Sequence, residues 1–341
     1  MATYKGIQGY TVQKLSEDPG TLGNVVGQLW YNSSTGKFKV GVQAAGAWSA
    51  GDNLNTARNV PGQGGTTTAA VCFGGNVPAV TANTETYNGT AWTEVNNLNT
   101  ARMQICGFGT SGTAVVAASG NANPPVMANC ETYDGTSWTE VNDLNYGAIS
   151  RGGAGTSTAG LACSGQDLAA AGSVPWAGAC ATNVEEWDGT SWTNGTAMNV
   201  CRKAMAGFGI QTAAIMAGGL GTPAGTVYYD LTESWNGTTW TEVADLNTGR
   251  AGFGGAGIQT NGMCFGGHHP VPIGKDETEL WDGTSWTEVA DMATGRSDLP
   301  GCGASQTTTA ALASGGYTTT FSAATEEWNG APVTAKTVTV S

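Results

Sequence analysis

Short runs of alternating apolar and polar residues, separated by glycine-containing turns, follow one another along most of the chain. In residues 131–141, ETYDGTSWTEV, a Glu is followed by an aromatic residue two positions later, by Asp-Gly, and by a Trp five positions after that aromatic. Alternation with a period of two is typical of a half-buried β-strand. Asn-Gly or Asp-Gly between two such runs favours a hairpin, because type I′ turns need positive φ at both central residues. The segment is therefore predicted to form two antiparallel strands joined by a tight turn.

The same hairpin pattern recurs along the chain. A sixth copy contains Trp328 and an Asn-Gly turn but has Val333 in place of the second Trp. Between the hairpins lie a Gly-x-Gly segment and an apolar run that ends in Gly-Gly or Ser-Gly, so each repeat holds four strands, and the turn glycines are 46 to 54 residues apart. Four strands in such a period are typical of a β-propeller blade. The complete pairs of first aromatic residue and Trp are Tyr87/Trp92, Tyr133/Trp138, Trp187/Trp192, Trp235/Trp240 and Trp281/Trp286.

The Trp that the sixth copy lacks is present near the start of the chain. Trp48 precedes Arg58 by ten residues, a spacing between Trp and Arg that four later repeats share. A propeller must join its first and last blades, and a blade built from both ends of the chain resists opening there. We therefore predict an all-β chain with a six-bladed propeller, in which residues 47–51 complete the blade that contains Trp328.

The C-terminal tail leaves an alternative open. Residues 333–340 alternate as a strand should, and they can pair at the edge of the last blade or with the hairpin at residues 28–40. If the tail is itself the sixth outer strand, Trp48 belongs to a partial seventh blade. The predicted domains are an N-terminal arm and hairpin, residues 1–46, as a docking segment, and the propeller, residues 47–341.

The six Arg residues of the chain and six hairpin Glu residues occur once per repeat. The Arg follows a Trp by ten residues in five repeats and by thirteen at Arg151. A ring of Arg side chains could bind an anion. Alternatively, each planar, five-donor guanidinium ties strands together by binding backbone carbonyls and the Glu. Equal numbers in fixed register favour this structural role. The structural repeat residues are Arg58, Arg102, Arg151, Arg202, Arg250, Arg296, Glu85, Glu131, Glu185, Glu233, Glu279, Glu326, Trp48, Trp92, Trp138, Trp192, Trp240 and Trp286.

Composition and charge narrow the class of protein. The formal charge of −13 disfavours nucleic acid binding, which depends on Lys and Arg at phosphates. No apolar run reaches the roughly 18 residues of a membrane-spanning helix, so we expect no membrane insertion, and the first residues lack the apolar core of a secretory signal. The eight cysteines include matching strand positions at Cys72, Cys163 and Cys264, and we expect reduced core thiols rather than disulfides.

The order Arg, apolar strand, Gly-Gly, variable loop, Glu-x-aromatic and Trp resembles the kelch repeat. The resemblance covers residues 47 to about 330, and it departs from the kelch pattern in a shorter hairpin between the aromatic residue and the Trp. It implies a kelch-like β-propeller fold. It implies little about function, because propellers host unrelated activities.

A second, shorter resemblance lies before the repeats. Residues 27–40, with GQLWYN followed by GKFK, resemble a hairpin motif of tail-fibre and appendage proteins of bacteriophages. The blades, rich in Gly, Thr, Asn and Ala and poor in Lys, are similar to kelch-like blades of marine phages. These resemblances imply a protein of the virion.

The sequence contains little that indicates catalysis. His268 and His269 are the only histidines and are neighbours in one loop. Kelch-type copper oxidases need His and Tyr ligands from separate blades, and no Cys/His spacing suggests zinc. We therefore expect no enzyme activity, no metal site and no cofactor. The loops with Trp176, His268 and His269 are interpreted as candidate partner contacts.

The interpretation that we favour is a non-enzymatic structural protein of a bacteriophage: a capsid decoration, tail or fibre component, made in the host cytoplasm and located in the virion. The arm, residues 1–46, would bind other virion proteins. The propeller would serve assembly or host attachment through a surface receptor or glycan, and homo-oligomerisation on the particle is left open. The alternatives are a cellular kelch-type protein-interaction module and, ranked last, a glycan-active enzyme.

Overall fold

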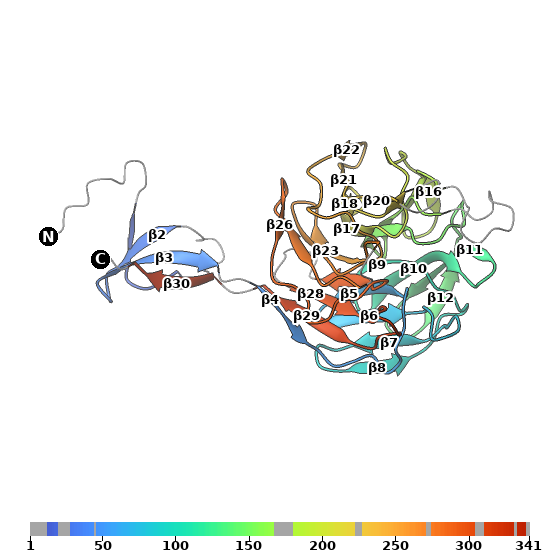
Figure 1. Ribbon diagram of the computed structural model, residues 1–341, viewed down its shortest axis with the longest axis horizontal. Helices are drawn as coiled ribbons and strands as arrows, with labels where there is room; N and C mark the ends of the chain where they lie inside the picture. The colour runs from blue at the N-terminus through green and yellow to red at the C-terminus, as the bar shows by residue number, and fades with distance from the viewer. Residues whose placement is uncertain are drawn as a thin grey trace. The chain divides into compact units, whose positions relative to one another are not determined.

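The described residues form β-strands, and the chain divides into two structural units. The regular elements of the described residues are all strands, mostly in four-stranded sheets. A repeat unit spans Ala47–Asn329, and a terminal unit combines Met1–Gly46 with Gly330–Ser341 (Figure 1). The predicted all-β architecture of repeated four-stranded, propeller-like sheets is confirmed. The computed structural model describes residues 12–19, 28–43, 46–166, 180–221, 227–270, 274–303, 310–330 and 333–338.

Within those residues, the repeat unit contains six four-stranded antiparallel sheets, of which the first five follow the chain in order. The first sheet consists of β5 (Gly62–Thr66), β6 (Ala69–Phe73), β7 (Thr84–Tyr87) and β8 (Trp92–Val95), and the second of β9 (Cys106–Ser111), β10 (Ala114–Asn121), β11 (Val126–Tyr133) and β12 (Trp138–Val141). The third consists of β13 (Gly152–Thr156), β14 (Ala159–Cys163), β15 (Val184–Trp187) and β16 (Trp192–Asn194). The fourth consists of β17 (Ala206–Ile210), β18 (Ala213–Ala217), β21 (Thr232–Trp235) and β22 (Trp240–Glu242), with a ribbon of β19 (Leu220–Gly221) and β20 (Val227–Tyr228). The fifth consists of β23 (Gly254–Ile258), β24 (Asn261–Phe265), β25 (Thr278–Trp281) and β26 (Trp286–Glu288).

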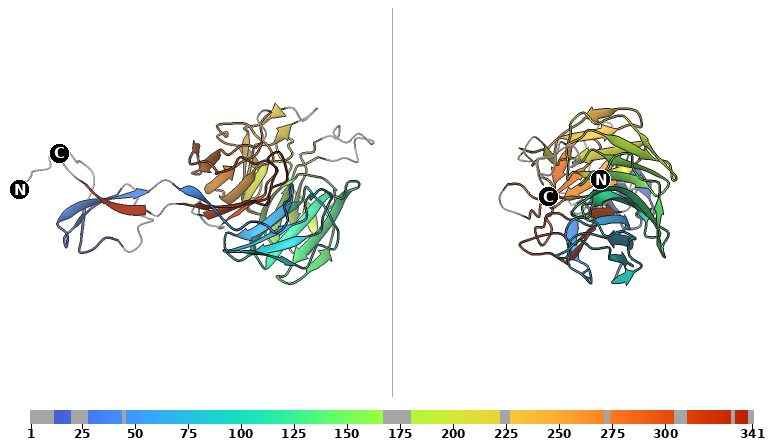
Figure 2. Two further views of the ribbon diagram at one scale, coloured as in Figure 1. Left: turned by 60° about the horizontal axis from the view of Figure 1, so that its bottom comes forward. Right: turned by 90° about the vertical axis from the view of Figure 1, so that its right-hand side faces the viewer.

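The sixth sheet is built from both ends of the repeat unit. Its strands are β27 (Gly301–Gly303), β28 (Ala310–Ser314), β29 (Thr325–Asn329) and β4 (Ala47–Ala50). Trp48 lies directly opposite Trp328, and their ring centroids are 5.7 Å apart. The predicted pairing of Trp48 with residues 325–330 is therefore confirmed. In Figures 1 and 2 the red strands of this sheet lie beside the blue strands of the first sheet, and β27 contacts β5.

The terminal unit is a second kind of sheet. Its order is β1 (Gln13–Leu15), β2 (Leu29–Asn32), β3 (Lys37–Gln43) and β30 (Val333–Thr337). Of the two places predicted for the C-terminal tail, the hairpin at residues 28–40 is the one that it occupies, while β4 pairs with β29 in the last sheet. The predicted propeller range, residues 47–341, is thus too long: the repeat unit ends at Asn329.

The repeat hairpins form at the predicted positions but with a longer turn than a type I′ turn. Tyr133 and Trp138 are opposite one another, which leaves a four-residue connection. Only Gly135 has positive φ in it, at 95°. The Asp134 carboxylate accepts hydrogen bonds from the backbone N–H groups of Thr136 and Ser137, both at 2.8 Å. The Asp therefore acts through its side chain, as in an Asx turn, rather than through a left-handed backbone.

Large side chains fill the space between neighbouring sheets. Phe73 of the first sheet packs against Trp138 of the second, with ring centroids 4.8 Å apart, in one buried apolar cluster. Near the innermost strands the sheets instead approach by backbone. A Cβ on Gly107 would lie 2.7 Å from the backbone N of Gln63 in the adjacent sheet. In Figure 1 β5, β9, β17 and β23 face a common centre, which explains the small residues there and the large aromatic residues farther out.

Truncating Trp48 is expected to destabilise the repeat unit about as strongly as truncating Trp138. Trp138 is buried, and Trp48, although only partly buried, packs against Trp328 and against Phe265 of the adjacent sheet. Removing a buried large aromatic costs roughly 3–5 kcal/mol. Urea unfolding of Trp48→Ala and Trp138→Ala, followed by circular dichroism, measures the two losses. Tyr146→Ala is the control, because Tyr146 is 44% exposed. A Trp48→Ala effect as small as that of the control would contradict the role of β4 in joining the chain ends.

Candidate functional site

A buried Arg in each repeat binds acceptors of its own sheet. In the fourth sheet, Arg202 donates from Nη1 to the carbonyl oxygens of Gly218 and Leu231, at 3.0 and 2.5 Å, and from Nη2 to Glu233 Oε1 at 2.9 Å. The guanidinium groups are therefore used inside the sheets, as the structural interpretation predicts, rather than exposed to an anion. The matching ion pairs, 2.5 to 3.0 Å long, are Arg58–Glu85, Arg102–Glu131, Arg151–Glu185, Arg250–Glu279 and Arg296–Glu326.

The backbone of the same Arg joins its sheet to the preceding one. Arg202 N donates to Ser164 Oγ at 2.9 Å, and Gly165 N donates to the Arg202 carbonyl at 3.0 Å. The other carboxylate oxygen of Glu233 accepts from Asn199 N, in the connection that leads to Arg202, at 2.8 Å. Each Arg–Glu pair thus fixes one connection between successive sheets.

An Asn three residues before most of these Arg residues, which was not predicted, binds the same Glu. In the first repeat, Asn55 donates its backbone N–H and its side-chain amide to Glu85 Oε2, at 2.6 and 2.9 Å, and the amide also binds the Trp92 carbonyl at 3.1 Å. The signal was the recurring Leu-Asn or Met-Asn before the Arg. The corresponding residues are Asn99, Asn145, Asn199 and Asn247, with Ala293 in the last repeat.

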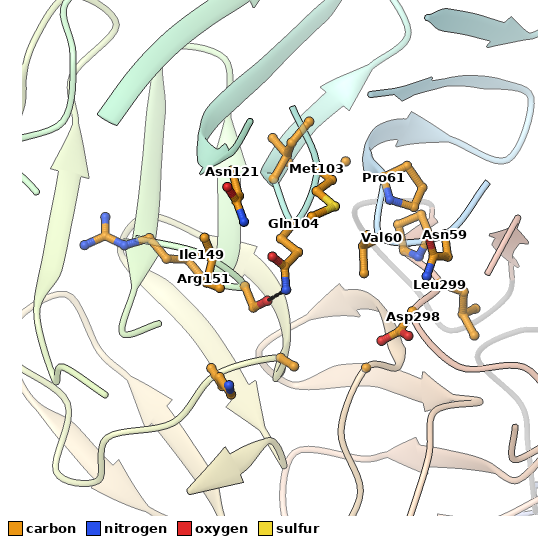
Figure 3. Close-up of a pocket in the computed structure, with 18 of the residues that line it drawn as sticks. Asn59, Val60, Pro61, Met103, Gln104, Asn121, Ile149, Arg151, Asp298 and Leu299 are labelled. Carbon is orange, nitrogen blue, oxygen red and sulfur yellow. Dashed lines mark hydrogen bonds between the residues drawn. The ribbon is translucent and has the colours of Figure 1, made fainter. Parts of the chain in front are cut away.

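Arg151 is not in the register of the other five. The backbone hydrogen bond that the other repeats make with their Arg carbonyl is made here with Ala148, whose carbonyl accepts from Gly120 N. Arg151 reaches Glu185 Oε1 at 3.0 Å from three residues farther along. Its backbone borders a cavity, while in Figure 3 its guanidinium points away from Gln104. The sequence interpretation that all six Arg residues share one position is therefore wrong for this repeat.

A cavity of about 1000 Å³ lies where the connections before the innermost strands meet. Apolar side chains such as Met103 and Leu299 and polar ones such as Asn121 line it together (Figure 3). Within it Gln104 Nε2 donates to Ser150 Oγ at 3.2 Å. The cavity draws on residues from all six sheets and their connections, so it belongs to the repeat array as a whole.

Six backbone hydrogen bonds form a closed circuit around this cavity. Each N–H donates to the carbonyl of the equivalent residue in the preceding sheet, at 2.7 to 3.1 Å, and the last bond returns to the first sheet. All six residues have positive φ, from 47° to 63°, which is unfavourable for residues other than Gly, Asn and Asp. The repeated hydrogen bonds explain why such a backbone persists. In order, the residues are Val60, Gln104, Ser150, Ala204, Gly252 and Asp298.

A polar cluster occupies one side of the circuit. A Cβ on Gly252 would lie 2.7 Å from Asp298 Oδ1 and 3.0 Å from His268 Nδ1, so a side chain there would displace one of these groups. Tyr228 packs against His268, with ring centroids 5.4 Å apart. Burial raises the pKa of the Asp298 carboxyl above its ordinary 3.8, against the lowering effect of His268. Burial, followed by the charge of Asp298, also raises the pKa of Tyr228.

Polar atoms without hydrogen-bond partners add to this cluster. Asn59 Oδ1 and His268 Nδ1 are buried atoms without a hydrogen-bond partner, and both residues line the cavity. Asp298 is the one carboxylate among the described lining residues. Buried polar atoms in proteins are ordinarily paired. The arrangement can therefore form hydrogen bonds with a ligand that carries several hydroxyl groups.

The predicted contact residues have different outcomes. His268 lines the cavity, and its predicted contact with a partner stays a prediction. His269 lies beside Tyr228, with ring centroids 5.5 Å apart. Trp176 lies outside the described residues. Asp298 and Tyr228 were not predicted. A signal was present for Asp298, because it stands two residues after Arg296 where the other repeats have no acidic residue.

Comparisons with known proteins name no family. No protein-family model matches the chain, and no curated protein is significantly similar to it. In the part of the chain that the structure describes, no helix has the length and apolar character needed to cross a membrane, and no group of three His, Cys, Asp or Glu residues is arranged to hold a metal ion.

Replacing Asp298 by Asn is expected to raise the melting temperature at pH 7. Because the pKa of Asp298 is raised on folding, the protonated form is favoured in the folded state; its contribution to stability is full below the unfolded pKa and is lost as pH rises through the folded pKa. The neutral amide avoids that loss. Thermal melts from pH 3 to pH 8 should show the advantage of Asp298→Asn disappearing below roughly pH 4.

The matched control is Asp291→Asn, on the exposed surface, which should change the melting temperature little at any pH. A fall in the melting temperature of Asp298→Asn at neutral pH would mean that the carboxylate is stabilised by its surroundings. That result would overturn the inference that this group is held at a cost to stability.

Proposed function

We propose that the repeat unit is a six-bladed, kelch-like β-propeller whose sixth blade joins the two ends of the array. The observation that carries the proposal is the closed circuit of backbone hydrogen bonds from Val60 to Asp298, which returns to its start after six sheets. The pairing of β4 with β29 is a second support, and it disfavours a partial seventh blade. Buried clusters between successive sheets include one that links Cys302 of the sixth sheet with Cys72 of the first.

We further propose that the chain is a non-enzymatic structural protein of a bacteriophage particle, in which the terminal unit binds other virion proteins and the repeat unit is displayed. The supporting observation is topological. The chain begins and ends the repeat unit at Ala47 and Asn329, which are paired, and the flanking segments pair again as β3 and β30. One small sheet therefore holds both ends of the displayed unit, which suits attachment without disturbing the blades.

This proposal is tested with a chain reduced to residues 47–329. Because its two ends are adjacent in the sixth sheet, the reduced chain is expected to fold with the melting temperature of the full chain but to be absent from purified particles. Mass spectrometry of particles assembled with either chain measures incorporation. Incorporation of the reduced chain would place the docking surface on the blades, and absence of the full chain from particles would contradict a virion role.

For the displayed unit we propose that the cavity binds a glycan of the host surface. Asp298 and Asn59 Oδ1 supply acceptors for sugar hydroxyl groups, and His268 Nδ1 and amide side chains such as Gln104 and Asn121 supply further polar contacts. Glycoside hydrolysis ordinarily uses a pair of carboxylates. One carboxylate among the described lining residues therefore favours binding over hydrolysis.

A panel of bacterial surface glycans, incubated with the purified full chain, tests this binding. For a glycan that binds, Asp298→Asn should lower the affinity by roughly tenfold to a hundredfold, because a hydrogen bond to a charged group contributes about 1.5–3 kcal/mol. Asp291→Asn should leave the affinity unchanged. Binding that is equally strong in both variants would move the glycan away from the cavity. A cellular protein-interaction module, the alternative function, predicts capture of a protein instead.

A further inference from the structure

Two of the eight cysteines differ from the others in their surroundings. Cys180 and Cys201 are partly exposed, whereas the remaining six are buried in the sheets. Cys180 lies just before β15, in a backbone bridge with Gln166. Cys201 lies in the connection from the third sheet to the fourth, directly before Arg202. Neither position belongs to the matching strand cysteines that the repeat explains.

The fold brings these two cysteines together through Ser164. Its hydroxyl lies 2.6 Å from the carbonyl oxygens of both Ala181 and Arg202, the residues that follow the two cysteines. Arg202 N also donates to Ser164 Oγ at 2.9 Å. The two thiols lie within hydrogen-bond reach of each other. Burial, followed by this hydrogen bond with Cys201, raises the pKa of Cys180.

The other repeats show how close this pair of positions is. The residue before the Arg faces the residue that corresponds to Cys180. A Cβ on Gly249 would lie 2.5 Å from the Tyr228 carbonyl oxygen, and a Cβ on Gly295 would lie 2.3 Å from that of Gly274. The first position thus lies against the backbone of the second, and a disulfide needs residues that are close neighbours in this way. Among the described repeats, only this one has Cys at both positions.

We propose that Cys180 and Cys201 form a thiol–disulfide exchange site, which closes to an intramolecular disulfide on reaction with a small disulfide such as oxidised glutathione. One protein thiolate attacks the glutathione disulfide and forms a mixed disulfide, and one glutathione thiolate leaves. The second protein thiolate then attacks the protein sulfur of the mixed disulfide, and the second glutathione leaves. The two protein thiols are oxidised, one glutathione disulfide is reduced to two thiols, and the two protons pass to the released thiolates.

The closed form would add a covalent link between two connections that meet through Ser164 and through backbone hydrogen bonds. A disulfide restricts the unfolded chain, so the oxidised protein should melt at a higher temperature. The thiolate is the reacting species, and the pKa of Cys180 is raised. Closure should therefore be slow at pH 7 and accelerate with pH, up to about tenfold per pH unit while the attacking thiol is mostly protonated.

The test uses the full chain, first reduced and freed of reductant, then incubated with oxidised glutathione at pH 7, 8 and 9. Mass spectrometry of peptides from the non-reduced protein should find a cross-link between Cys180 and Cys201, faster at higher pH, together with a higher melting temperature that reductant reverses. Cys180→Ser and Cys201→Ser should each stop at a mixed disulfide with glutathione and lose the rise in melting temperature.

Two controls keep the result specific. Cys201→Ala and Cys201→Ser should melt at the temperature of the reduced protein, which separates the loss of the cross-link from a failure to fold. The same reaction in concentrated urea should cross-link the buried cysteines as well. Folded protein in which both thiols take up glutathione but never join at pH 9, or in which Cys180 joins a different cysteine, would overturn the proposal.

Discussion

Each joint between successive sheets depends on an ion pair that is buried. Moving a guanidinium and a carboxylate out of water is costly, and the attraction between them compensates only when their remaining donors and acceptors are also satisfied. Arg202 meets most of that condition: its Nη atoms bind two carbonyls and Glu233, and Glu233 binds Asn199 in turn, while its Nε is buried without a partner. Removing either partner would leave a charge without compensation inside the protein. The pair therefore specifies the connection geometry as well as stabilising it.

Because the connections hold the sheets in fixed positions, side chains are small near the common centre and larger farther out. Sheets that turn about a common centre crowd at their inner strands, so Gly107 meets the backbone of Gln63 directly. Farther out the gap widens, and pairs such as Phe73 and Trp138 fill it. The same packing extends to the sixth sheet, where Trp48 contacts both Trp328 and Phe265. The two ends of the chain thus share the packing rule of the other sheets.

The side chains at equivalent positions around the cavity differ from sheet to sheet. The circuit of backbone hydrogen bonds uses only N–H and carbonyl groups, so the side chain at each of its positions is not constrained by the circuit itself. Val60, Gln104 and Asp298 occupy equivalent places with different chemistry. Proteins commonly retain buried polar groups at functional sites despite a loss of stability. Asp298 beside His268 is the position where that reasoning applies most directly.

The sequence by itself determined the repeated four-stranded sheets, the buried aromatic hairpins and the pairing of Trp48 with Trp328, because alternation, turn residues and spacing are local signals that recur. It could not show that Ala148 takes the register position of an Arg, nor choose between the two predicted places for the tail, since both depend on which backbone groups find partners in space. Only the tertiary structure decided the cavity and the cluster of Tyr228, His268 and Asp298. Residues from three separate connections meet there because the sheets are arranged around one centre. Their spacing along the chain does not indicate that they are close in space.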